Sequence, residues 1–212
     1  MTRTRELFLT AALAAADLLS TPEVEAAWHE PSALPKMSVQ ALAGHLAVQV
    51  FFVSKALEAP LPAEKPISVH DYYAQASWIG SDPDDDFGQT IRTMGEREAA
   101  DGASALSTRV AEAVRELREV LPSTPPRPVR RANWGPYSLT LDDYATTRLL
   151  EIAIHNDDLA HSVGVPTPEL PTEAIEIVVD LLSRIALRRH GATNVLRALS
   201  RAERAPMSIA AL

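Results

Sequence analysis

Apolar side chains recur at helical spacing along most of the chain, and short segments rich in proline or glycine separate these stretches. An apolar stripe that repeats every three to four residues is typical of an amphipathic or buried helix. The pattern predicts long helices over residues 4–19, 38–57, 87–121, 141–163 and 172–189. No alternation of apolar and polar residues is long enough to predict a sheet, so we expect an all-α fold.

The connections between these helices are long, which excludes a simple series of helical hairpins. Ser38 is placed to cap the second helix, and Gly164 is placed to end the helix over 141–163. Between residues 129 and 139 we expect irregular structure or a short hairpin. The organisation predicts one four-helix bundle domain over residues 1–190, with extra short helices, and a short helical tail over 191–212 without a second domain.

The composition narrows the classes of function. The chain has no cysteine, which excludes disulfides, zinc–thiolate sites and a cysteine nucleophile. Its formal net charge is −8 and its pI is near 5.2. A general nucleic-acid binder would need a basic face, so we expect no nucleic-acid partner.

The sequence shows no convincing targeting or membrane segment. The apolar run over residues 7–19 is interrupted by Asp17 and preceded by Glu6, unlike the continuous apolar core of a signal peptide. No uninterrupted apolar stretch approaches the roughly 20 residues that a membrane span requires. We therefore expect a cytoplasmic protein with no membrane partner.

One face of the helix predicted over 141–163 carries polar side chains three or four residues apart. A solvated face with pairs between successive turns explains such a stripe. The rest of the helix circumference is largely apolar, which instead favours a buried helix, and buried charged side chains need partners or a metal. Both interpretations stay open. At about 100° per residue, six polar residues fall within a sector of about 80°: Tyr144, Arg148, Glu151, His155, Asp158 and Ser162.

A histidine in the helix predicted over 38–57 offers a further ligand. His45 lies among apolar residues and therefore faces the interior, and Gly44 beside it permits the close approach of a neighbouring helix. An interior histidine is commonly a hydrogen-bonded core residue. Glu151 and His155, four residues apart, could instead join His45 as two imidazoles and a carboxylate around zinc or another first-row divalent ion.

Two motifs of the chain match the pattern of a known family. The first is Pro35-Lys-Met-Ser-Val-Gln-Ala-Leu-Ala-Gly-His45-Leu, and the second is Thr147-Arg148-Leu-Leu-Glu151-Ile-Ala-Ile-His155-Asn-Asp-Asp158-Leu. Together they resemble the DinB-like metalloenzyme superfamily, and more closely its mycothiol-dependent branch, typified by the N-terminal domain of mycothiol-dependent maleylpyruvate isomerase. The resemblance covers roughly residues 5–190.

The resemblance implies a metal centre and a small thiol. His45, Glu151 and His155 match the residues that hold a divalent metal, usually zinc, and Asp158 and Arg148 match positions close to it. The thiol is mycothiol, the low-molecular-weight thiol of actinobacteria. Because a metal with an open position can deprotonate a bound thiol, we expect S-transfer from mycothiol to a small electrophilic substrate.

The two charged neighbours of the metal ligands each have two interpretations as catalytic residues. Asp158 could take up a proton or orient His155 as a hydrogen-bond acceptor. Arg148 could bind a substrate carboxylate bidentately or pair with Glu151 or Asp158.

Aromatic residues are the candidates for cofactor binding. Trp134 and Tyr137 lie in a loop with Gly135 and Pro136 just before the helix over 141–163, where they could form a wall at the mouth of a pocket. Tyr144 lies on the polar stripe of that helix. We take Trp134 and Tyr144 as candidates to contact mycothiol.

The C-terminal part of the chain differs from that of the isomerase. The isomerase carries a separate C-terminal domain, whereas only a short segment follows Arg189 here. We therefore expect a transferase rather than an isomerase. Two other classes stay open: a metal-dependent hydrolase on the same bundle, and a non-catalytic bundle that binds a ligand.

Overall fold

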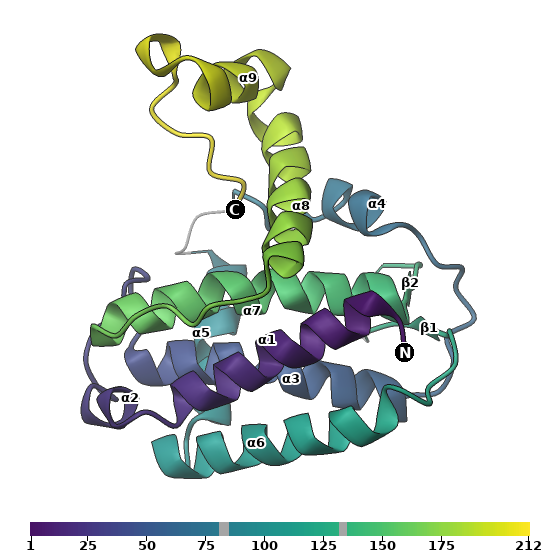
Figure 1. Ribbon diagram of the computed structural model, residues 1–212, viewed down its shortest axis with the longest axis vertical. Coiled ribbons are helices and arrows are strands. Elements are labelled where there is room, and N and C mark those ends of the chain that lie inside the picture. Colours follow the sequence, from purple (N-terminus) through teal and green to yellow (C-terminus); the bar gives the residue numbers. More distant parts are fainter. Residues whose placement is uncertain (81–84, 132–134) are drawn as a thin grey trace.

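The computed structural model describes residues 1–80, 85–131 and 135–212, and four long helices form the body of the molecule (Figure 1). They are α1 Arg3–Leu19, α3 Val39–Glu58, α6 Ala103–Val120 and α7 Leu141–Val163. Both α1 and α3 pack against α6 and α7, so the four helices enclose one core. The predicted all-α bundle is confirmed.

The remaining elements lie outside this body. They are α2 Pro22–Ala26, α4 Val69–Ala74, α5 Asp86–Glu98, α8 Thr172–His190, α9 Ala192–Ser200, the 3₁₀ helix η1 Ala202–Arg204, and the strands β1 Pro128–Val129 and β2 Leu139–Thr140. The two strands pair antiparallel with Pro128 opposite Thr140, which confirms a short hairpin between α6 and α7. Helices α2, α4 and α5 lie within the long connections of the bundle.

Local sequence signals set the ends of the two helices that carry the candidate site. The Ser38 hydroxyl accepts a hydrogen bond from the Ala41 amide, as predicted for an N-cap, and the Thr140 hydroxyl accepts one from the Asp143 amide. Gly164 ends α7 in the left-handed conformation, with φ of 71°. These caps fix where α3 and α7 begin and where α7 stops.

The single helix predicted over residues 87–121 is wrong. The structure has two helices, α5 and α6, separated by a turn at residues 99–102. Gly102 lies at φ of 95°, outside the helical region, and it precedes the first residue of α6. The apolar spacing continues across the turn, so periodicity alone did not reveal the break.

Helices α3 and α5 approach each other closely through two glycines. A Cβ on Gly44 would lie 2.0 Å from the carbonyl oxygen of Gly95, and a Cβ on Gly95 would lie 2.1 Å from the carbonyl oxygen of Ala41. Only glycine fits at either position, because the neighbouring atoms belong to backbone that cannot rotate away. The prediction that Gly44 allows close approach of a helix is confirmed, with α5 as that helix.

Helix α3 is enclosed by α5, α6 and α7, which all pack against it. Among the described residues it is the one helix long and apolar enough to cross a membrane by length and composition, and 78% of its apolar window is buried inside the protein. Packing within the bundle accounts for the apolar character of this helix.

We expect Gly44→Ala to destabilise the protein. Overpacking a core usually costs about 1–3 kcal/mol, and here the added methyl group meets backbone atoms. That cost exceeds the roughly 1 kcal/mol that alanine gains over glycine in helix propensity. Urea denaturation followed by circular dichroism should show a lower free energy of unfolding. Gln89→Ala, at an exposed position of α5, is the control, and equal stability of the two variants would contradict the packing argument.

Candidate metal centre

The polar stripe of α7 turns towards the bundle. Tyr144 and Arg148 are buried, and Glu151, His155 and Asp158 expose 14, 14 and 22% of their side chains. A stripe facing water would leave most of each side chain exposed. The solvated-face interpretation is therefore wrong, and the question becomes what satisfies the buried charges.

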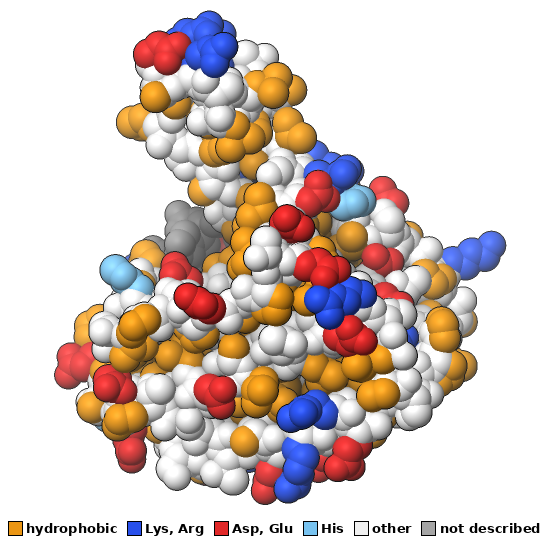
Figure 2. Space-filling model, viewed as in Figure 1, with side chains coloured by type: hydrophobic (Ala, Val, Ile, Leu, Met, Phe, Trp, Pro, Cys, Tyr) orange, Lys and Arg blue, Asp and Glu red, His pale blue; other side chains and the backbone are white. Residues whose placement is uncertain are grey.

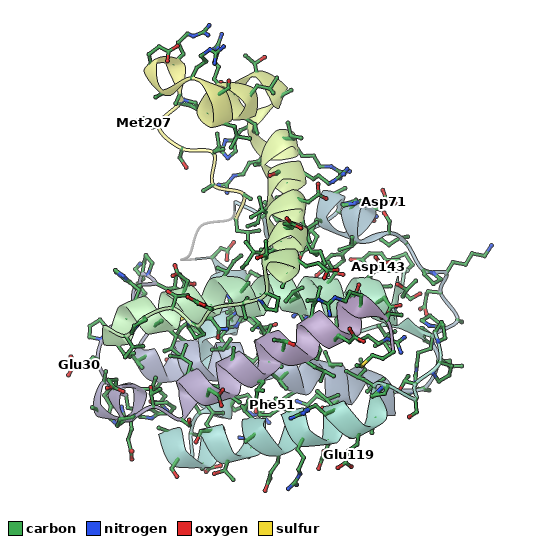
Figure 3. The ribbon with its side chains drawn as sticks, in the orientation of Figure 1. Glu30, Phe51, Asp71, Glu119, Asp143 and Met207 are labelled. Atoms are coloured by element: carbon green, nitrogen blue, oxygen red, sulfur yellow. The ribbon has the colours of Figure 1, made fainter. Side chains whose placement is uncertain are left out.

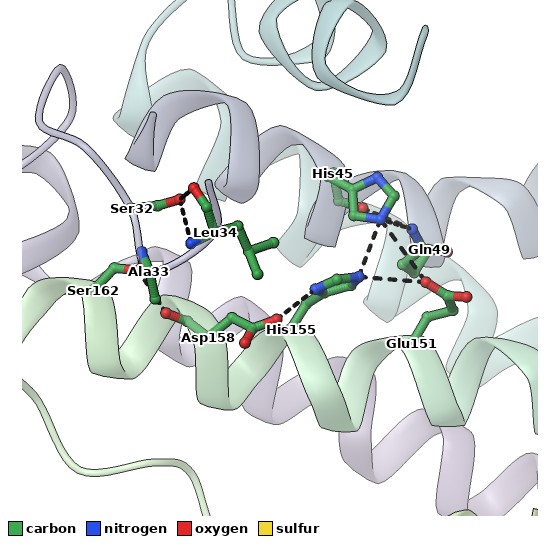
Figure 4. A network of polar contacts seen from close by, with 9 residues as sticks. All are labelled: Ser32, Ala33, Leu34, His45, Gln49, Glu151, His155, Asp158 and Ser162. Carbon is green, nitrogen blue, oxygen red and sulfur yellow. Dashed lines mark hydrogen bonds and ion pairs between the residues drawn. The ribbon is translucent and has the colours of Figure 1, made fainter. Parts of the chain in front are cut away.

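The structure brings His45 of α3 to Glu151 and His155 of α7 (Figure 4). The two imidazole Nε2 atoms lie 3.1 Å apart. Glu151 Oε2 lies 3.4 Å from His155 Nε2 and 3.8 Å from His45 Nε2. Ligand atoms bound to zinc at about 2.0–2.1 Å in a tetrahedron are about 3.3 Å apart, so these donor atoms have nearly the separation that a zinc ion requires.

Two imidazoles and a carboxylate that converge on one point need a shared cation, either a proton or a metal. Burial alone would lower the pKa of His155, but hydrogen bonds to Asp158 and Glu151 outweigh it and raise this pKa to about 9. Burial lowers the pKa of His45. At neutral pH without a metal, His155 therefore carries the proton and His45 is neutral.

The carboxylate of the cluster is held in its charged form. Burial alone would raise the pKa of Glu151, but hydrogen bonds from His155 and His45 and the charge of Arg148 lower it well below the ordinary value for glutamate. A buried glutamate that stays ionised at neutral pH can serve as a metal ligand without first losing a proton.

Asp158 orients the imidazole of His155. Its Oδ2 atom lies 2.9 Å from His155 Nδ1, one turn along α7. A proton on Nδ1 donated to this carboxylate leaves Nε2 directed at Glu151 and His45 (Figure 4). Paired carboxylate and histidine of this kind fix the ring of a metal ligand and increase its basicity.

The loop before α3 is tied to the same turn of α7. The Ser162 hydroxyl donates to the Asp158 carbonyl oxygen at 2.6 Å and accepts from the Ala33 amide at 2.8 Å. The segment that leads into α3 is thereby anchored beside the end of the candidate site.

Gln49, one turn after His45 on α3, connects the site to Arg148. Its amide nitrogen donates to the His45 carbonyl oxygen at 2.8 Å and lies 3.4 Å from His45 Nε2. Its amide oxygen accepts from Arg148 Nη1, while Arg148 Nε donates to the Thr147 hydroxyl at 3.1 Å. Arg148 therefore bonds to neutral groups, and its charge acts on Glu151 through space.

Further aromatic and basic residues lie near the cluster. The guanidinium of Arg131 stacks 3.9 Å above the ring of Phe52, and burial lowers the pKa of this arginine. Tyr73 of α4 is buried, its hydroxyl has no hydrogen-bond partner among the described residues, and burial raises its pKa. The charge of Glu151 adds to the shift at Tyr73, which places the two side chains in one electrostatic environment.

The aromatic residues considered as cofactor contacts have different surroundings. Trp134 lies outside the described residues. Tyr137 makes an edge contact with Tyr72 of α4 at 6.2 Å between ring centroids. Tyr144 is buried, with its ring 5.3 Å from the Arg148 guanidinium and its hydroxyl 3.5 Å from the Phe52 carbonyl oxygen. A contact of Tyr144 or Trp134 with mycothiol stays a prediction.

Sequence reasoning missed Gln49 and Tyr73 as members of the site. Gln49 carried a usable signal, because it lies four residues after His45 on the same helical face. Tyr73 carried none, since it lies in a connection whose path depends on the tertiary structure.

Comparison with known proteins identifies the family of the chain. No curated protein and no solved structure gives a significant match. One family model, described as the mycothiol maleylpyruvate isomerase N-terminal domain, matches residues 8–160. The matched segment includes His45, Glu151 and His155 and stops within α7, before α8 begins. The chain therefore belongs to the mycothiol maleylpyruvate isomerase N-terminal domain family.

Proposed function

We propose that this chain is a metal-dependent enzyme that activates mycothiol for S-transfer to a small electrophilic substrate. The family supports a mycothiol-related function of the isomerase or transferase type. The observation that carries the finer proposal is the convergence of His45, Glu151 and His155, whose donor atoms all lie within 4.8 Å of one another. We also propose a cytoplasmic location, in keeping with the use of a low-molecular-weight thiol.

His45, Glu151 and His155 would hold the metal, and zinc suits two nitrogen donors and one oxygen donor best. Three protein ligands leave coordination room for a small molecule. A bound divalent ion lowers the pKa of a thiol, so that the nucleophilic thiolate forms near neutral pH. The chain itself has no cysteine, so the reacting sulfur comes from the cosubstrate.

The remaining residues act by positioning the ligands. Asp158 holds His155 by its Nδ1 atom at 2.9 Å, which favours the orienting role over proton uptake. Arg148 bonds to Gln49 and keeps the pKa of Glu151 low. Because its Nε and Nη1 atoms are already engaged, bidentate binding of a substrate carboxylate receives less support than this electrostatic role.

Removing a ligand should abolish metal binding. We expect His45→Ala, His155→Ala and Glu151→Gln to lose stoichiometric zinc, measured by mass spectrometry of the purified protein and by titration calorimetry. Asp158→Asn removes only the orienting hydrogen bond and should weaken affinity by about 10–100-fold. His161→Ala, at an exposed position of α7, is the control. Unchanged zinc content in the ligand variants would reject the metal site.

Zinc affinity should increase with pH. Below about pH 9 His155 carries a proton, and the ion must displace it because both bind the same nitrogen. One displaced proton tightens the apparent Kd by about tenfold per pH unit, and the increase levels off near the pKa of the imidazole. In Asp158→Asn the pKa of His155 is lower, so the plateau should begin at lower pH. Competition with a chelator at several pH values measures both profiles; a flat wild-type profile would contradict a protonated His155.

Turnover should depend on both metal and thiol. We expect zinc-loaded protein to conjugate mycothiol to a generic electrophile, and His45→Ala and the chelator-treated wild type to be inactive. Product is measured by mass spectrometry as the thioether. Turnover of the electrophile without thiol would reject the transferase in favour of a metal-dependent hydrolase. Zinc binding without any turnover across a panel of electrophiles would favour a non-catalytic ligand-binding bundle.

A further inference from the structure

The facing sides of α3 and α7 carry three successive layers of side chains. The first layer is the metal cluster, and the second is Gln49 bonded to Arg148. In the third layer the Tyr144 hydroxyl lies 3.5 Å from the Phe52 carbonyl oxygen. Phe52 follows His45 by seven residues, which is about two turns and roughly 10 Å of α3. The third layer therefore lies on the same face of α3 as the cluster, at a distance that a small molecule can span.

Arg131 covers the third layer. Its guanidinium lies 3.9 Å from the centroid of the Phe52 ring. Stacking on an aromatic ring orients the guanidinium plane and leaves its N–H groups free to bind other partners. Arg131 is half-buried, and within residues 1–80, 85–131 and 135–212 it forms no hydrogen bond or ion pair. Its donors are therefore available at one end of the site.

The segment that precedes Arg131 is fixed to the bundle. Arg127 donates from Nη1 to the Leu57 carbonyl oxygen at 2.9 Å and from Nη2 to the Ala59 carbonyl oxygen at 2.7 Å, which ties it to the end of α3. Strand β1 ends two residues before Arg131 and pairs with β2. The position of Arg131 over Phe52 thus follows from contacts of the preceding segment.

Two arginines share one carboxylate at this end of the site. Arg148 is buried and bonds to neutral groups. Glu151 is the carboxylate whose charge acts most strongly on both Arg148 and Arg131. Glu151 also belongs to the metal cluster, where a bound cation would neutralise it. Because positive charge that is shielded from water needs a counter-charge, an anion bound here is favoured.

Carboxylates on the adjoining segments already have partners. Glu64 Oε1 lies 3.4 Å from Arg130 Nε. Asp71 and Asp143 each accept a hydrogen bond from the hydroxyl that caps their own helix, α4 and α7 respectively (Figure 3). Acidic side chains are spread over the body of the molecule (Figure 2), whose formal net charge is −8. The positive charge is therefore a local property of the site and not of the surface as a whole.

We infer that Arg131 determines the substrate specificity of this site by binding an anionic group, such as a carboxylate, on the electrophilic substrate. The inference rests on the proposed function, since it assumes that the reacting carbon lies at the metal cluster. Phe52 orients the guanidinium, and the charge of Arg148 adds to the attraction. Arg148 is the weaker candidate to hold the anion, because two of its nitrogens already donate to Thr147 and Gln49.

Two electrophiles that differ in charge test the inference on the zinc-loaded protein. Mycothiol displaces bromide from para-(bromomethyl)benzoate or para-(bromomethyl)benzamide: the sulfur–carbon bond forms, the carbon–bromine bond breaks, and the thiol proton passes to solvent. Hydrogen bonds to a charged group contribute about 10–100-fold in affinity. We therefore expect the wild-type kcat/KM to be about 10–100-fold higher for the benzoate, measured from the thioether product after subtraction of the uncatalysed rate.

Substitutions of Arg131 should change this preference. Arg131→Gln should bring the ratio of the two kcat/KM values close to one, mainly through a higher KM for the benzoate, and Arg131→Lys should keep a smaller preference. Arg130→Gln removes the same charge one residue away and is the matched control, with the wild-type ratio expected. A ratio that Arg131→Gln leaves unaltered would overturn the inference. A higher KM for mycothiol in place of the benzoate would assign the anion to the thiol and overturn it as well.

A binding measurement separates failure of this inference from failure of the proposed function. The unreactive para-methylbenzoate is titrated calorimetrically into zinc-loaded and into chelator-treated protein, because zinc itself binds carboxylates. We expect Arg131→Gln to weaken binding about tenfold or more in both forms, with an unaltered circular dichroism spectrum. Arg131-dependent binding without turnover would support the anion subsite and reject the transferase. Turnover without Arg131-dependent binding would support the transferase and reject the subsite.

Discussion

The burial of ionisable side chains between α3 and α7 is the constraint on which the rest of the site depends. Glu151, His155 and Arg148 enter the bundle on one face of α7, where water solvates their charges only in small part. His45 and Gln49 on α3 meet them and supply the nitrogen and amide groups that they need. The network that satisfies the charges is also the set of atoms that could bind a metal.

This arrangement requires α3 to be held accurately from both sides. Gly44, beside His45, lets α5 approach α3 to backbone contact, and α7 packs on another side of the same helix. The cap at Ser38 and the anchoring of the preceding loop by Ser162 fix where α3 starts. Ligand geometry in this protein therefore rests on helix packing, because the three donor atoms come from two rigid helices rather than from loops.

Helices whose ends carry strong local sequence signals could be predicted. Elements whose position depends on the course of a connection could not. Helix α7 runs over the predicted residues 141–163 because a cap at Thr140 and a left-handed glycine at Gly164 bound a continuous helical pattern. The break between α5 and α6 was missed because the apolar spacing is continuous across it, and Gly102 alone does not prescribe a turn. Tyr73 could not be assigned to the site because the sequence does not specify the path of the connection that contains α4.

The sequence by itself determined the helical class and the helix that carries the polar stripe, and its motifs singled out His45, Glu151 and His155 as candidate metal ligands. The class and the stripe follow from periodicity and from side chains at spacings of three and four residues. Only the tertiary structure decided that the stripe faces inward and that His45 meets it across the bundle. Burial and the juxtaposition of distant segments arise from helix packing, and no spacing within a single helix contains that information.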